Sequence, residues 1–262
     1  MENKLRVVVF TQNDIFFIPQ NIIAASKVCN IIEVVDNKDK SSLDNKILDM
    51  ITWFGFFQCA KMGLRLFLRK IEGFLDLLTS YKMFGGKCNI KHAANLIGAN
   101  YLVVPNINAV SFVNHVRKLQ PDLIISYSAP QIVKTELLNI PRFGIINVHG
   151  ALLPNYRGCM PSFWYLYNGE KIGGATVHLM SSDIDDGDIC LQESIDISDC
   201  DSMFKLIKKT KLLGGKLIVE AIKQFSLGTI ETRHNNTSEG SYFSWPTKEH
   251  AKIFRDNGLK FN

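Results

Sequence analysis

Two polar residues that could do chemistry lie two positions apart in NVHGALLPNYRG, residues 147–158. Asn147 and His149 follow FGII, a short apolar run that predicts a strand, and alternate residues of a strand point to the same side. They are either solvated at a strand end or aimed together into a cleft. An amide and an imidazole in one cleft could donate hydrogen bonds to one oxygen atom and transfer a proton.

The elements around this pair decide between the two interpretations. Buried parallel strands are predicted by apolar, β-rich runs at 5–10, 31–35, 101–104, 123–127 and 144–147. Helical stretches separate them, one of them near residues 21–28 and another at 131–138. The alternation predicts an α/β, doubly wound, mostly parallel sheet flanked by helices. Ligands bind such sheets at the carboxyl ends of the strands, which is where Asn147 and His149 fall. No GxGxxG or Walker-type loop follows the first strand, so a dinucleotide or P-loop site loses its main support.

Two regions depart from the alternation. Residues 42–82 form a helical insertion that is rich in aromatic and basic residues, with its helix at 47–78. We expect this helix to lie in a core or at a subunit interface, as in a homodimer, rather than on a membrane. Residues 1–200 are predicted to be the main domain, and residues 201–262 a short C-terminal extension. The extension has a helix at 202–225 and an aromatic tail that caps the main domain.

Composition narrows the classes of function. The net charge of +5 suits an anionic ligand but is too small to indicate nucleic-acid binding. Six cysteines without CxxC spacing are expected to be reduced thiols in a cytoplasmic protein. The sequence shows no secretory leader and no apolar span, which also favours a cytoplasmic location. The Asp-rich DIDDGD lacks the EF-hand spacing, so no metal is expected there.

The segment INVHGALLPNYRG, followed by GATVHLMSSDIDDGDIC, resembles the folate-dependent formyltransferases that act on methionyl-tRNA, glycinamide ribonucleotide or amino sugars. The shared pattern is Asn-x-His, a Leu-Pro loop with Arg and Gly, and an Asp in an apolar-Asp-x-Gly turn. Here these are Asn147, His149, the loop 152–158 and Asp185. The resemblance implies a Rossmann-like formyltransferase fold and N10-formyltetrahydrofolate as the formyl donor.

The three residues suit formyl transfer to an amine, which passes through a tetrahedral oxyanion and releases a proton. Asn147 can donate to the formyl oxygen. His149 can donate to the same oxygen and protonate the departing folate nitrogen. Asp185 can orient His149 and accept the proton of the amine, directly or through water.

Other residues near the motif have roles that its pattern specifies less closely. Tyr156 and Arg157 are candidate substrate contacts, although Arg157 could instead brace its own loop. His178 lies in an apolar strand and is expected to be a hydrogen-bonded core histidine, while Asp186 and Asp188 are expected to be solvated. By the resemblance, backbone groups of two loops would bind the pterin. The candidates are Ser128, Pro130, Gln131, Met180, Ser181 and Asp183.

The acceptor is inferred by elimination. Only about 60 residues follow the predicted catalytic core, and the charge is mild, which disfavours a tRNA. The first strand leads into FTQNDIFF without glycine, which weakens the glycinamide ribonucleotide alternative. The remaining class formylates an amino-deoxysugar linked to a nucleotide, for a surface polysaccharide. A lipid-linked amino sugar and a non-catalytic, folate-binding relative stay open as alternatives.

Overall fold

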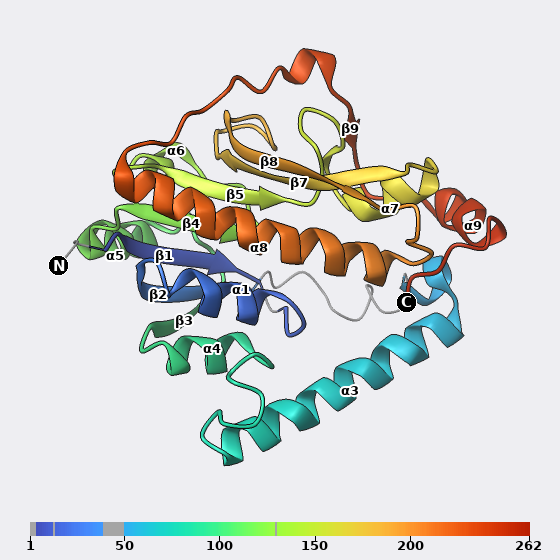
Figure 1. The fold of residues 1–262 in the computed structure, drawn as a ribbon, viewed down its shortest axis with the longest axis horizontal. Coiled ribbons are helices and arrows are strands. Elements are labelled where there is room, and N and C mark those ends of the chain that lie inside the picture. Colours follow the sequence, from blue (N-terminus) through green and yellow to red (C-terminus); the bar gives the residue numbers. More distant parts are fainter. Residues whose placement is uncertain (1–3, 13, 39–49, 129) are drawn as a thin grey trace.

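The protein is described here from a computed structural model that covers residues 4–12, 14–38, 50–128 and 130–262. Part of the predicted insertion, residues 42–49, lies outside the described residues. The predicted α/β sheet is confirmed (Figure 1). Seven strands lie in the order β3-β2-β1-β4-β5-β7-β8. Their bounds are β1 Arg6–Thr11, β2 Asn30–Asn37, β3 Asn100–Val104, β4 Leu123–Tyr127, β5 Ile145–His149, β7 Ile172–Leu179 and β8 Ile189–Asp196.

The first five strands of this order are parallel, and β7 and β8 are antiparallel to their neighbours. The run VVVF in β1 shows why the parallel strands read as continuously apolar. Val7 and Val9 pack into the core on one side of the sheet, while Val8 and Phe10 pack into the core on the other side. A strand covered on both faces is therefore mostly apolar, and its polar residues gather towards its ends, as Arg6 and Thr11 do in β1.

Helices cover the two faces of the sheet (Figure 1). One core contains residues of α1 (Ile18–Ala25), α4 (Ile90–Leu96) and α8 (Met203–Leu227). The other contains residues of α5 (Val110–Leu119) and α6 (Thr135–Leu138). The helix predicted near 21–28 therefore begins three residues earlier, where Pro19 fits the first turn. The helix predicted over 131–138 is shorter than expected and occupies only α6.

The C-terminal residues return across the molecule after α8. They run along the edge of the sheet to η1 (Thr237–Glu239) and β9 (Tyr242–Phe243), which pairs with β6 (Arg157–Gly158), and end with α9 (Lys248–Asp256) (Figure 1). The tail is anchored by aromatic residues. Phe254 of α9 stacks on Phe163 of α7 (Pro161–Tyr167), with ring centroids 4.7 Å apart, and the Trp164 indole N–H donates to the Ser244 carbonyl.

The helical insertion contains α3 (Phe56–Leu78), preceded by helical residues 50–54. The helix runs beside the body of the protein rather than within it (Figure 1). Burial in a core, one of the two expected placements, is therefore wrong for α3, because most of its large apolar side chains are exposed. All six cysteines are unpaired, as expected.

Candidate active site

Asn147 and His149 lie at the end of β5, between β4 and β7. Asn147 is in register with Ser126 of β4 and with His178 of β7, and His149 is in register with Thr176. Their spacing of two places both side chains on one side of the strand, as predicted from the sequence. The two neighbouring strands thus bring further polar residues to the same place, and His178 is one of them.

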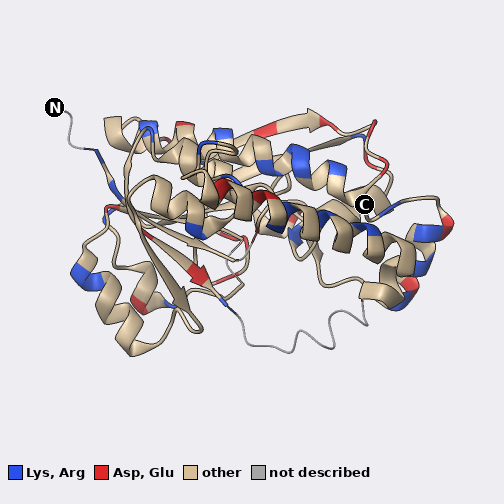
Figure 2. Cartoon of the chain, turned by 90° about the horizontal axis from the view of Figure 1, so that it is seen from below, with Lys and Arg blue, Asp and Glu red and all other residues tan. Residues whose placement is uncertain are grey.

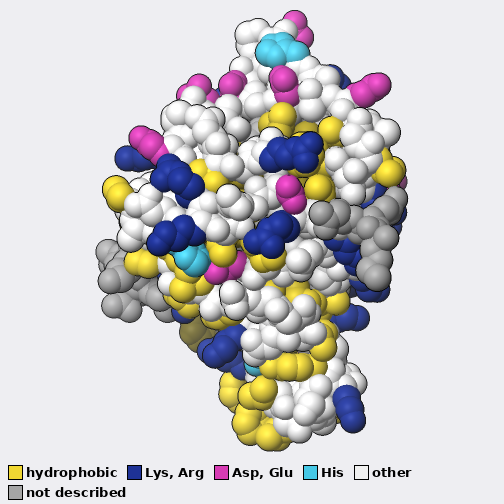
Figure 3. All heavy atoms as spheres, turned by 90° about the vertical axis from the view of Figure 1, so that its left-hand side faces the viewer, with side chains coloured by type: hydrophobic (Ala, Val, Ile, Leu, Met, Phe, Trp, Pro, Cys, Tyr) yellow, Lys and Arg dark blue, Asp and Glu magenta, His cyan; other side chains and the backbone are white. Residues whose placement is uncertain are grey.

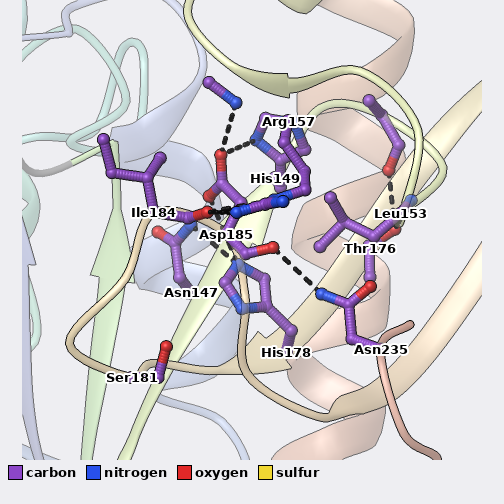
Figure 4. A network of polar contacts seen from close by, with 12 residues as sticks. Asn147, His149, Leu153, Arg157, Thr176, His178, Ser181, Ile184, Asp185 and Asn235 are labelled. Carbon is purple, nitrogen blue, oxygen red and sulfur yellow. Dashed lines mark hydrogen bonds and ion pairs between the residues drawn. The ribbon is translucent and has the colours of Figure 1, made fainter. Parts of the chain in front are cut away.

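The turn after β7 carries Asp185 back to β5 (Figure 4). Asp185 has a left-handed backbone, with φ of +50°. Two residues later, a Cβ on Gly187 would lie 2.0 Å from the Leu179 carbonyl oxygen, so only glycine fits there. The apolar-Asp-x-Gly pattern is therefore what lets the chain turn tightly enough for the Asp185 carboxylate to reach His149.

His149 is 6% exposed, and both of its ring nitrogens have neighbours. Nε2 lies 2.7 Å from the Tyr156 carbonyl oxygen, which can only accept, so Nε2 carries a proton. Nδ1 lies 3.5 Å from Asp185 Oδ2. Burial lowers the pKa of His149 below its usual value, and this outweighs the attraction of Asp185. At neutral pH the ring is therefore uncharged, with a free lone pair on Nδ1.

Asp185 is ionised in this setting. Its burial disfavours the carboxylate, but the histidines His149 and His178 and the backbone N–H of Gly158 together hold its pKa well below the ordinary value. The Gly158 N–H donates to Oδ2 over 2.9 Å. A proton that arrives at His149 Nδ1 would lie next to this carboxylate, so the pair can accept and hold a proton.

His178 is buried and hydrogen-bonded, as predicted for a core histidine, and it also contacts the site. Its Nδ1 donates to the Leu179 carbonyl, so in the neutral ring Nε2 accepts a hydrogen bond from Asn147 Nδ2 over 3.2 Å. Nε2 also lies 3.6 Å from Asp185 Oδ1. His178 thus fixes the carboxamide of Asn147. The signal in the sequence was a second histidine in a strand that precedes the Asp-containing turn.

The loop 152–158 closes one side of the site. Arg157 donates through Nε and Nη2 to the Ile184 carbonyl, so it braces the turn that carries Asp185. The Tyr156 hydroxyl donates to Glu170 over 2.6 Å, and its ring stacks between Tyr165 and Phe243. Of the two roles considered for Arg157, the bracing role has contacts in the described structure. Substrate contacts of Tyr156 and Arg157 stay predictions.

The C-terminal segment holds the same turn from the other side. The buried Asn235 donates from Nδ2 to the carbonyl oxygen of Asp185 over 2.9 Å (Figure 4). Thr237 donates to the Asp186 carboxylate, which is therefore not merely solvated as expected. The sequence contained no sign of these contacts, because Asn235 lies 50 residues from Asp185 in a stretch that reads as a polar loop.

The residues predicted to bind the pterin follow β4 and β7, the two strands that flank β5. Several of their groups have protein partners. Gln131 contacts the backbone of Pro105 and Ile107, the Met180 N–H donates to the Ile145 carbonyl, and Ser181 contacts Asp183. Pro130 follows residue 129, which is outside the described residues. A role of all six in cofactor binding stays a prediction.

A lysine that the sequence analysis did not single out lies beside one of these loops. The ammonium group of Lys211, on α8, donates to the Ser128 hydroxyl over 2.5 Å. Burial lowers the pKa of Lys211, and Asp14 opposes that shift. Lysine and arginine are otherwise spread over several helices and loops of the molecule (Figure 2).

No group of three or more His, Cys, Asp or Glu residues in the described part of the chain could hold a metal ion. None of the described helices has the length and apolar composition needed to cross a membrane.

Comparisons with known proteins confirm the resemblance seen in the sequence. Residues 103–222 match the formyl transferase family. A methionyl-tRNA formyltransferase from Thermodesulfovibrio yellowstonii is 37% identical over 150 residues, which are 57% of this chain and 48% of that protein. The bifunctional polymyxin resistance protein ArnA from Wigglesworthia glossinidia brevipalpis is 36% identical over 159 residues, 61% of this chain and 24% of that protein. The chain spans about half of the first relative and about a quarter of the second.

Solved structures share the fold at lower identity. A glycinamide ribonucleotide transformylase from Symbiobacterium toebii gives a TM-score of 0.61 at 17% identity, covering 90% of this chain and 96% of that one. A sugar N-formyltransferase from a Shewanella species gives 0.57 at 17% identity, covering 96% of this chain and 87% of that one. The sheet described above is therefore that of the formyltransferases.

Proposed function

We propose that this chain, whose residues 103–222 match the formyl transferase family, transfers a formyl group from N10-formyltetrahydrofolate to the amine of a nucleotide-linked amino-deoxysugar. The observation that carries the reaction type is the contact of His149 and Asp185 beside Asn147 at the end of β5. A neutral imidazole, an ionised carboxylate and an oriented amide are the groups that acyl transfer to an amine requires.

Each group has a role in the proposed reaction. The amine nitrogen of the acceptor bonds to the formyl carbon, and an oxyanion develops on the formyl oxygen. Asn147 donates an amide N–H to that oxygen while His178 holds the carboxamide in place. The amine's surplus proton passes to Nδ1 of His149, where Asp185 stabilises the charged ring. The bond from the formyl carbon to N10 of the folate then breaks, and N10 takes the proton.

This scheme changes one detail of the sequence-based hypothesis. His149 was expected to donate to the formyl oxygen, but its Nε2–H is bound to the Tyr156 carbonyl at 2.7 Å. Nδ1 has no proton to donate while the ring is neutral. His149 therefore acts in the scheme as the group that moves the proton, and Asn147 as the donor to the oxyanion.

The choice of acceptor rests on two solved structures of the same fold and on charge. The similarity to the Shewanella sugar N-formyltransferase covers 96% of this chain and 87% of that one. A neighbour from Helicobacter canadensis, 18% identical with a TM-score of 0.60, was solved with folinic acid and dTDP-3-aminofucose. The net charge of +5 is mild, whereas a tRNA needs a strongly basic surface. These observations favour a small acceptor carried on a nucleotide.

A methionyl-tRNA is the second candidate, because seven of the matching relatives bear the name methionyl-tRNA formyltransferase, at 34–38% identity. Only part of each of those proteins is matched, for example 48% of the Thermodesulfovibrio enzyme. Identity over a shared catalytic segment supports the reaction type more than the acceptor.

The test is a transfer assay with N10-formyltetrahydrofolate as donor. Nucleotide-linked 3-amino and 4-amino sugars are offered beside initiator methionyl-tRNA and glycinamide ribonucleotide, and tetrahydrofolate release and the formylated product are both measured. We expect turnover on an amino sugar, and its loss in His149→Ala. Turnover on the tRNA alone would overturn the acceptor, and folate binding without turnover on any acceptor would support the non-catalytic alternative.

A further inference from the structure

Helix α3 contacts the body of the protein through its polar side. Arg65 lies over the ring of Phe204 of α8, 4.2 Å from the ring centroid. Arg69 donates to the carbonyls of Ile15 and Lys87, and the fully buried Asp76 accepts from the N–H groups of Phe84 and Gly86. An amphipathic helix of a water-soluble protein normally does the reverse and turns its apolar stripe inward.

The opposite side of α3 is apolar and exposed. Its apolar side chains follow alternating steps of three and four residues, which is the heptad spacing of a helix that packs against another helix. The series is Phe57, Ala60, Leu64, Phe67, Ile71, Phe74 and Leu78. Phe57 is 86% exposed, and Phe67 and Phe74 are each 60% exposed. No charged residue interrupts the series over three heptads.

Residues beside this series widen the face. Phe56, Leu68, Leu75 and Leu77 are also exposed. Taking a whole Phe side chain as about 200 Å², the four phenylalanines of the face alone expose on the order of 500 Å², and the leucines add to that. A typical monomer has no exposed apolar patch larger than this, and a standard protein interface buries about 800 Å² per partner. The face is large enough for a stable dimer contact. Hydrophobic side chains also gather at the lower end of the molecule in Figure 3.

The charges around the face argue against a lipid surface as its occupant. A helix lying on a membrane keeps lysine and arginine free on its polar side, where they meet the lipid headgroups. On α3 the two arginines contact the body and Lys61 donates to the carbonyl of Asn262, which leaves Lys70 as the one lysine or arginine of this described helix without such a contact. A lipid surface would also not require a heptad register, whereas a partner helix does.

We propose that α3 pairs with α3 of a second copy of this chain, forming a helix–helix dimer interface through the series from Phe57 to Leu78. Asn147 and His149 lie on β5 of the sheet and not on α3, so the pairing uses no residue of the candidate active site. The inference does not depend on the proposed function, because it concerns the surface of α3 alone.

The test measures the mass of the protein in solution by light scattering after size-exclusion chromatography. The wild-type chain should elute at twice its 29.6 kDa mass. Phe67→Glu, in the middle of the series, should be a monomer at the same concentration. Val110→Glu is the matched control, because Val110 is 77% exposed at the start of another helix, α5. It should remain a dimer, and circular dichroism should show that both variants are folded.

A mixing experiment identifies the partner surface. Position 67 lies at the middle of α3, so in a pair that overlaps along its length it lies within about one turn of position 67 of the partner. Mixing Phe67→Glu with Phe67→Lys should therefore restore a dimer that neither variant forms alone. A wild-type monomer, with or without binding to anionic vesicles, would overturn the proposal. So would a dimer that survives Phe67→Glu, or a mixture that stays monomeric.

Discussion

Polar groups are usually exposed and apolar groups buried, and two regions depart from this rule. At the end of β5 polar groups are buried, and on the outer face of α3 apolar groups are exposed. At β5, His149 is 6% exposed and lies against an ionised Asp185. On α3, Phe57 is 86% exposed and has no acidic or basic side chain in its series. The end of β5 shields titratable groups from water, whereas the outer face of α3 exposes apolar side chains to water.

The difference shows what each region requires. Burying polar groups is tolerated when they have polar partners. The Gly158 N–H donates to the Asp185 carboxylate, Asn235 donates to the Asp185 carbonyl oxygen, and the rings of two histidines lie within 3.6 Å of the carboxylate. Exposing an apolar face is tolerated when something outside the chain covers it. The first region is therefore complete within one chain, whereas the second requires a partner.

The largest effect is expected for Asp185→Asn, which tests whether the buried site depends on one charge. An amide keeps the shape and can still accept from the Gly158 N–H, but it cannot stabilise a protonated His149. We expect formyl transfer to fall roughly 10⁴-fold, or about 5.5 kcal/mol in activation free energy. Single-turnover kinetics measure it. A fall below tenfold, with the fold unchanged, would mean that Asp185 has only a structural role.

Two phenylalanines provide the sharpest comparison of stability. Phe163 is fully buried and stacks on Phe254, whereas Phe57 is 86% exposed. We expect Phe163→Ala to lower the free energy of unfolding by about 3–5 kcal/mol. Phe57→Ala should change it by less than about 0.5 kcal/mol in dilute, dissociated protein. Urea unfolding measures both. Similar losses in the two variants would show that the α3 face packs within its own chain.

These predictions separate what the sequence determines from what it leaves open. The strands were predictable because a strand covered on both faces is mostly apolar, as in the middle of β1. The common side of Asn147 and His149 was predictable because strand periodicity is two. Asp185 was found by resemblance, and the turn chemistry at Gly187 explains its position afterwards.

The rest of the site depends on neighbours distant in the chain. His178 meets Asn147 only because β7 pairs with β5 in one register, 31 residues along the chain. Asn235 reaches Asp185 only because the C-terminal segment returns across the sheet. For α3 the sequence predicts an apolar face from its period, but periodicity does not state whether the chain itself covers that face. Its exposure was therefore not predictable.

A smaller effect is expected for His178→Phe, which tests whether the site includes the residue that the sequence analysis assigned to the core. Phenylalanine keeps the ring volume but cannot accept from Asn147 Nδ2, so the carboxamide loses its fixed orientation. We expect kcat to fall about 10- to 30-fold, or about 1–2 kcal/mol, with a smaller change in KM. His178→Gln, which keeps an acceptor, should recover part of the loss. Equal activity in both variants and the wild type would mean that His178 only packs in the core and does not orient Asn147.

The smallest effect concerns the stability of the buried site against acid. Burial lowers the pKa of His149 in the folded chain below the ordinary 6.5 that it has in the unfolded chain. At a pH between the folded and the unfolded pKa, the unfolded chain therefore binds a proton that the folded chain does not. The His149 contribution to the free energy of unfolding should therefore decline as the pH falls below about 6.5. The Asp185 contribution declines only below its ordinary pKa of 3.8, outside this window.

Comparing wild type with His149→Asn by urea unfolding at pH 7.5 and 5.5 isolates the histidine, because all other titrating groups are shared. We expect the wild type to lose more stability than the variant on acidification, because the unfolded chain then binds a proton that the folded His149 does not. Equal losses would mean that His149 titrates alike in the folded and unfolded chain. The ring of His149 would then be solvated or permanently paired with Asp185. The contrast between the buried site and the exposed face of α3 would then not hold for His149.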